Sequence, residues 1–141
     1  MTMTTLTPHE ARAHALAEKF VEFLETNEAP AGLLAPDVFC DLTMPTWRLQ
    51  ASGPEACVAM RRAGHPAKGT VPRWRFDPTP TGFVLEVEEA WDWDGDHWTC
   101  REMFRADISD AGITEFSVYC TGDWDSARRA EHTAAVTLIR P

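Results

Sequence analysis

Two glutamates fall on the apolar face of a predicted β-hairpin, where a carboxyl group is unexpected. The dipeptide Asp94-Gly95 is typical of a two-residue hairpin turn, and counting outward from it pairs position 87 with 102 and position 89 with 100. Because strand side chains alternate with period two, Glu89 and Glu102 share one face with mostly apolar neighbours. A carboxyl group there is costly unless it is paired, protonated or open to a pocket. Glu102 is therefore a candidate catalytic acid, and Glu89 is a second candidate site residue.

Two structural roles for Glu102 remain open from the sequence. Its carboxyl group can bond a buried indole or a backbone group and serve packing alone, or it can lie in water at the mouth of a barrel. Perturbed carboxylates occur in structural networks as well as in active sites, so position alone does not decide between them.

The composition indicates one globular domain that spans residues 1–141. The formal net charge is -9 and no basic cluster is present, which argues against a nucleic-acid surface and against binding to an anionic membrane. The apolar stretches are too short to span a bilayer, and the N-terminus lacks the basic-then-apolar pattern of a signal peptide. A cytoplasmic location is the expectation.

The cysteine and histidine spacings predict neither a metal site nor a cofactor. Cys40, Cys57, Cys100 and Cys120 form no CxxC pair, and the five histidines are scattered along the chain. Apolar neighbours in predicted strands favour buried free thiols in a reducing compartment.

The order of the predicted elements favours an α+β fold. A capping box at Thr7-Pro8-His9-Glu10 starts a helix that ends near Asn27, and Ser52-Gly53-Pro54-Glu55 starts another that stops at Gly64. A short helix or turn is plausible at 31–34. Strands are expected at 38–42, 73–77, 83–93, 96–108 and 113–121. The polar segment 123–132 predicts one or two helical turns, and 133–140 an edge strand or an arm to a partner.

Such a layout wraps one curved sheet around the N-terminal helices and leaves a cone-shaped cavity, which is a natural site for a small molecule. Tyr119 should face outward. The register that keeps apolar faces together places Phe116, Val118 and Cys120 beside Phe104, Glu102 and Cys100. The residues expected to line the cavity are Phe20, Trp47, Val87, Glu89, Trp91, Trp98, Cys100, Phe104, Phe116, Val118 and Cys120. For at least half of the six tryptophans, packing in the core or at a subunit interface is the alternative.

Several segments resemble the nuclear-transport-factor-2-like (NTF2-like) superfamily, and within it the SnoaL-like polyketide cyclases and ketosteroid isomerases. They are Ala35-Pro36-Asp37-Val38-Phe39-Cys40-Asp41, the helix start Gly53-Pro54-Glu55-Ala56, and the strand-turn-strand from Phe104 to Ile113. The resemblance implies a cone-shaped α+β barrel, with three N-terminal helices against a strongly curved, mainly antiparallel sheet. It also implies a homodimer through the outer sheet face.

The same resemblance implies roles for particular residues. Asp41 occupies the place of the isomerases' general base, and Glu102 that of a protonated acid which donates to the developing oxyanion. Phe20 stands near the place of their tyrosine and lacks its hydroxyl group, so that oxyanion hole is incomplete.

These observations favour a cofactor-independent cyclase or isomerase that acts on a hydrophobic, polyketide-like metabolite by carboxylate acid-base chemistry. One alternative is a non-catalytic ligand-binding or assembly domain of the same fold. Another is an epoxide hydrolase-type enzyme. Limonene-type epoxide hydrolases, which share the scaffold that this chain resembles, carry an Asp-Arg-Asp arrangement around a water. Arg101 and Arg105 fall on the wrong face for that arrangement, so Arg48 or Arg73 would have to enter the pocket.

Overall fold

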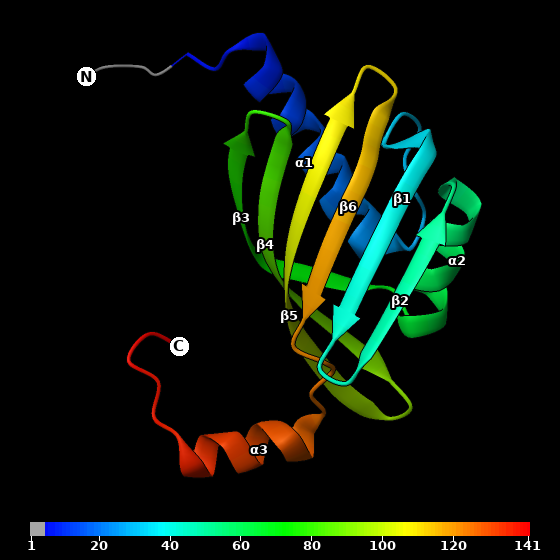
Figure 1. Ribbon diagram of the computed structural model, residues 1–141. Coiled ribbons are helices and arrows are strands. Elements are labelled where there is room, and N and C mark those ends of the chain that lie inside the picture. The colour runs from blue at the N-terminus through cyan, green and yellow to red at the C-terminus, as the bar shows by residue number, and fades with distance from the viewer. Residues whose placement is uncertain (1–4) are drawn as a thin grey trace.

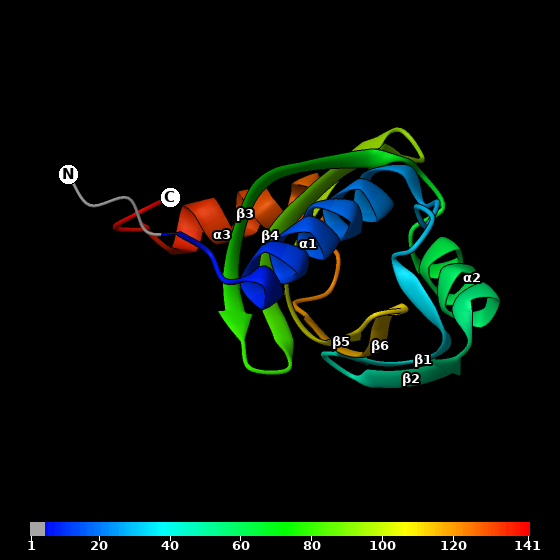
Figure 2. The same ribbon diagram turned by 90° about the horizontal axis from the view of Figure 1, so that it is seen from above.

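The computed structural model describes residues 5–141 as two layers, a curved sheet and the helices that its concave face encloses (Figure 1). The elements are α1 (Pro8–Thr26), β1 (Leu34–Met44), β2 (Trp47–Ser52), α2 (Pro54–Gly64), β3 (Gly69–Thr79), β4 (Gly82–Trp93), β5 (Asp96–Ser109), β6 (Gly112–Cys120) and α3 (Ser126–Ala135). One six-stranded sheet has the order β2-β1-β6-β5-β4-β3. Its neighbours are antiparallel except β1 and β6, which are parallel. The sheet remains open and curls around α1 (Figure 2). This is the expected α+β cone.

Helix α1 forms as the sequence predicts and supplies the centre of the core. Thr7 and Glu10 make the reciprocal bonds of a capping box, and Asn27 ends the helix in the left-handed conformation. Phe20 is buried and meets the sheet through edge-on contacts, 4.7 Å from the ring of Phe104 and 5.4 Å from that of Phe116. These aromatic contacts hold α1 against the strands that carry the pocket.

The β4–β5 hairpin has the predicted register, with Val87 opposite Glu102. Asp94 and Gly95 both have positive φ, 52° and 74°, which is the conformation of a type I′ turn. The predicted pairing of β5 with β6 is wrong by two residues, since Glu102 lies opposite Cys120. A tight turn and a β-bulge near the end of β5 produce this offset, and an offset of two keeps each side chain on its predicted face.

Other predicted elements need correction. Two helices, not three, precede the long strands, because residues 31–32 form a turn and β1 already begins at Leu34. The third helix is α3, near the C-terminus. Residues 133–135 belong to this helix, so the edge strand predicted for 133–140 is wrong. Helix α3 has no buried side chain and projects away from the cone in both views (Figures 1 and 2). No helix within residues 5–141 is both long enough and apolar enough to cross a bilayer.

The isolation of α3 gives a stability prediction. A chain that ends at Asp125 should lose at most about 1 kcal/mol of unfolding free energy, because α3 buries no side chain against the cone. Leu85→Ala, at a fully buried position, should cost about 2–5 kcal/mol and serves as the comparison. Urea titration of the three proteins measures both values. A truncation as costly as Leu85→Ala would contradict the detached position of α3.

Candidate functional site

A cavity of about 350 Å³ lies between α1, α2 and the concave face of the sheet. That volume falls within the range of small-molecule pockets, about 300–1,000 Å³. Most of the wall is apolar, and four ionisable side chains other than cysteines interrupt it: Arg61, His65, Glu102 and Asp123. The remaining lining residues are Phe20, Phe23, Leu24, Cys40, Leu42, Met44, Trp47, Leu49, Cys57, Met60, Ala63, Gly64, Phe104, Phe116, Val118 and Cys120.

The structure brings some of the predicted site residues to this cavity and not others. Those that line it are Phe20, Trp47, Glu102, Phe104, Phe116, Val118 and Cys120. Val87, Glu89, Trp91 and Cys100 are buried but are not part of its wall. Trp98 also lies outside the wall, where its indole donates a hydrogen bond to the carbonyl of Trp93.

The structure does not bring Asp41 to Glu102. Its neighbours in β1, Cys40 and Leu42, face the cavity, so alternation along the strand turns Asp41 to the outer face. There it accepts two hydrogen bonds from Arg48 of β2, at 2.9 and 2.6 Å. Arg48 lowers the pKa of Asp41, which is therefore an ionised group on the outer face of the sheet.

The ionised centre of the site is a buried pair between Arg61, in the last turn of α2, and Glu89 of β4. Both terminal nitrogens of Arg61 bond the Glu89 carboxylate, one of them at 2.9 Å. The same guanidinium donates to the carbonyl of Leu24 at 2.8 Å and to the side chain of Asn27 at 3.1 Å, which joins α1 to α2. Burial by itself raises the pKa of Glu89, but hydrogen bonds with Glu102 and Arg61 outweigh it and lower that pKa to about 2.

Glu102 holds a proton beside this pair. Its side chain is 6% exposed, and burial, followed by the charge of Glu89, raises its pKa well above the usual value. Two carboxyl groups in contact share one proton, and Arg61 keeps the negative charge on Glu89, so the proton resides on Glu102. Glu102 also accepts a hydrogen bond from the thiol of Cys100 at 3.4 Å. A neutral carboxylic acid on an apolar wall can donate a hydrogen bond to an oxygen atom of a ligand.

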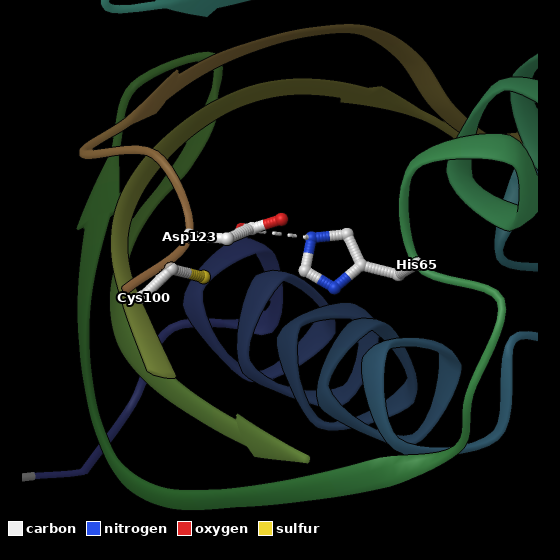
Figure 3. A group of neighbouring side chains, drawn as sticks. All are labelled: His65, Cys100 and Asp123. Carbon is white, nitrogen blue, oxygen red and sulfur yellow. Dashed lines mark ion pairs between the residues drawn. The ribbon is translucent and has the colours of Figure 1, made fainter. Parts of the chain in front are cut away.

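Three donor groups from separate elements lie close together (Figure 3). His65 follows α2, Cys100 belongs to β5, and Asp123 follows β6. The ring of His65 packs edge-on against Trp91 at 4.5 Å, and its Nε2 lies 3.8 Å from Oδ1 of Asp123. Burial, then the charge of Arg61, lowers the pKa of His65 to about 4, so the imidazole is neutral near pH 7. Burial, then the charge of Glu89, raises the pKa of Asp123.

Comparison with known proteins matches the fold but not a sequence family. No family model matches the chain, and no curated protein matches its sequence. An NTF2-like protein from Anabaena variabilis superposes with a TM-score of 0.69 at 18% identity, over 87% of this chain and 97% of that one. A candidate polyketide cyclase from Xanthomonas campestris gives 0.62 at 18%, over 77% and 90%. An LEH-like epoxide hydrolase from Mycobacterium tuberculosis gives 0.59 at 13%, over 78% and 83%.

This chain has the NTF2-like fold. The expectation drawn from its sequence segments is therefore confirmed at the level of the fold. In this NTF2-like cone the residues that sequence reasoning missed are Arg61 and His65, which end or follow α2. For Asp123 the sequence favours a helix cap and leaves the cavity mouth as the alternative, and the structure places it in the cavity wall. The sequence offers one local indication of a site residue here, which is the position of Arg61 on an otherwise apolar face of its helix. No sequence spacing relates Arg61 to Glu89.

The Arg61–Glu89 pair gives a second stability prediction. Arg61→Met should cost about 3–5 kcal/mol of unfolding free energy, because it leaves the Glu89 carboxylate buried without its partner. Arg48→Met removes the same charge from the solvent-exposed pair with Asp41 and should change stability little. Chemical denaturation of both variants measures the contrast. Equal effects of the two changes would contradict the central position assigned to Arg61.

The proton on Glu102 gives a pH-dependent prediction. Because its folded pKa is raised above the usual 4.5, its contribution to stability is complete below pH 4.5 and is lost as pH rises toward the folded value. Glu102→Gln removes this titration. Its unfolding free energy relative to wild type should therefore increase with pH above 4.5, by at most about 1.4 kcal/mol per pH unit. Urea titrations across this window test it, and a difference independent of pH would count against the raised pKa.

Proposed function

We propose that this protein is an enzyme of the cyclase or isomerase type, which binds a small, mostly apolar molecule and acts on it through Glu102. The observation that carries the proposal is a buried carboxyl group, Glu102, on the wall of an apolar pocket beside the Arg61–Glu89 pair, where burial and the charge of Glu89 raise its pKa. Neutral carboxylic acids in apolar sites are effective donors to an oxygen atom that becomes negative during reaction.

The geometry supports a definite division of roles. Glu102 faces the cavity and donates its proton, or a hydrogen bond, to a carbonyl oxygen of the ligand. Glu89 does not face the cavity, and Arg61 keeps it ionised, so Glu89 determines which carboxyl group carries the proton. When a proton leaves Glu102, the guanidinium of Arg61 also compensates the new negative charge, since its field already acts on both carboxyl groups.

A polyketide-like substrate fits the apolar wall, where Phe20, Phe104 and Phe116 offer aromatic faces to a flat molecule. Trp47, with 65% of its surface exposed, lies at the cavity and can cover such a ligand from the rim. The structural likeness to a candidate polyketide cyclase supports the same substrate class.

Epoxide hydrolysis is a second candidate, and the buried arginine is the observation that favours it. Arg48 and Arg73 are both exposed, whereas Arg61 is buried, bonds the carboxylate of Glu89 and acts through its charge on Glu102. A carboxyl–arginine–carboxyl set can protonate an epoxide oxygen and hold a water molecule. The likeness to an LEH-like epoxide hydrolase supports testing this chemistry beside the first.

The test uses 2-acetylnaphthalene, a flat ketone whose α-protons are removed by the buffer base and replaced by deuterium, faster when its carbonyl group is activated. Wild-type protein should accelerate this exchange, followed by NMR, and Glu102→Leu should reduce the acceleration about 10²–10³-fold because the donor is lost. Glu102→Gln keeps a donor but cannot transfer a proton, so it should fall between the two. Glu88→Gln, on the opposite face of the same hairpin, is the matched control and should behave as wild type.

Other outcomes separate the candidates. Hydrolysis of styrene oxide that depends on both Arg61 and Glu102, without ketone exchange, would favour the epoxide chemistry. Binding of 2-acetylnaphthalene with no exchange above the buffer rate would indicate a non-catalytic binding domain. Exchange that persists in Glu102→Leu would overturn the role given to that residue.

A further inference from the structure

The convergence of His65, Cys100 and Asp123 has no role in the carboxyl chemistry above. One ligand atom from each of these residues lies within 4.8 Å of the corresponding atoms of the other two. Figure 3 shows the sulfur of Cys100 and the carboxylate of Asp123 directed toward the imidazole of His65. They come from three different parts of the fold, so only the closure of the cone brings them together.

These three side chains present electron pairs to one another. Within residues 5–141 neither ring nitrogen of His65 nor the carboxylate of Asp123 takes part in a hydrogen bond, and their mutual distance is 3.8 Å. The thiol of Cys100 donates to carboxyl oxygens, at 3.4 Å to Glu102 and 3.9 Å to Glu89, and also interacts with the thiol of Cys120. Arg61, the cation nearest to this group, is already bound to Glu89. A cation at the centre of the three groups would be attracted by their electron pairs and by the Asp123 carboxylate, and Glu89 offsets part of the repulsion from Arg61.

The spacing suits a small thiophilic cation. Zinc binds sulfur at about 2.3 Å, and imidazole nitrogen or carboxylate oxygen at about 2.0–2.2 Å, which places tetrahedral ligands about 3.4–3.7 Å apart. From separations of up to 4.8 Å, the three groups need to close by at most about 1.4 Å to reach that geometry. Asp123 lies in the segment between β6 and α3 and is 37% exposed, so its side chain can make most of this adjustment.

We propose that His65, Cys100 and Asp123 bind one zinc ion at the wall of the pocket. The chain supplies three ligands, and because His65 and Asp123 line the cavity, the fourth coordination position faces the ligand space. Trp91 fixes the plane of the imidazole by its edge-on contact. On binding zinc the Cys100 thiol releases its proton to the buffer, and Glu102, whose carboxyl group lies 3.4 Å from that sulfur, is the neighbouring side chain that can orient this ligand.

A second group of donors, Cys100 with Glu102 and Cys120, is the competing arrangement. It is less suited to a cation, because the proton of Glu102 is shared with Glu89 and the sulfur of Cys120 already accepts the backbone N–H of Gly122 at 3.3 Å. It also lacks an imidazole. The two arrangements share only Cys100, so variants of the other residues distinguish them.

The experiment measures binding directly, and its outcome does not depend on the proposed catalytic role of Glu102. Full-length protein, reduced and freed of metal by chelation, is titrated with zinc chloride in a calorimeter. Cobalt(II) is then added to a second sample as a spectroscopic probe. We expect one equivalent of zinc per chain and, with cobalt, the near-ultraviolet charge-transfer band that a thiolate ligand produces.

Variants assign the ligands. Cys100→Ser should abolish the charge-transfer band, and His65→Gln and Asp123→Asn should each weaken zinc binding by more than about tenfold, since even outer-shell changes cost about 10–100-fold. Cys57→Ser is the matched control, a buried thiol that lines the same pocket from α2 and bonds the carbonyl of Ala51. It should bind zinc as wild type does. Circular dichroism checks that each variant is folded.

Three results would overturn the proposal. The first is the absence of stoichiometric zinc binding to the folded wild-type chain. The second is binding that survives unchanged in both His65→Gln and Cys100→Ser. The third is binding that is lost in Cys120→Ser but kept in His65→Gln, which would assign the metal to the competing group.

Discussion

The buried ion pair between Arg61 and Glu89 is the interaction on which the site depends. One guanidinium bonds the Glu89 carboxylate of β4, the carbonyl of Leu24 and the side chain of Asn27, so it joins the sheet, α1 and α2 at one point. Asn27 in turn donates to the carbonyls of His65 and Ala67, which extends the connection to the segment after α2. The position of the pocket wall therefore follows from hydrogen bonds to a single side chain.

Such a pair is weak evidence for stability, since removing two charges from water offsets much of their attraction. Its clearest consequence is electrostatic. By keeping Glu89 ionised, Arg61 forces the shared proton onto Glu102 and disfavours charge on His65. The result is a pocket whose wall carries a neutral acid, a neutral imidazole and the partly exposed Asp123, while the carboxylate of Glu89 is buried outside the wall and compensated by Arg61. An apolar ligand can enter it without facing an unpaired buried charge.

The sequence predicted what local rules control. Asp94-Gly95 determined the hairpin register, and with it the placement of Glu102 on the concave face. Period-two alternation also placed Tyr119 on the outside, where it is 61% exposed. A position for Asp41 in the pocket was inferred from likeness to isomerases. The alternation of side chains along β1 places it on the outer face instead. The bulge that offsets β5 from β6 has no comparable signal.

The rest of the site could not be predicted because it is made by closure of the cone. Arg61 meets Glu89 across 28 residues of sequence, and His65 meets Asp123 across 58, with no spacing rule to connect either pair. The spacing of the histidines and cysteines in the sequence argues against a metal site, whereas the fold brings His65, Cys100 and Asp123 close together. In space Cys100 lies between the protonated Glu102 on one side and His65 with Asp123 on the other. One thiol thus contacts both the proposed acid group and the proposed cation site.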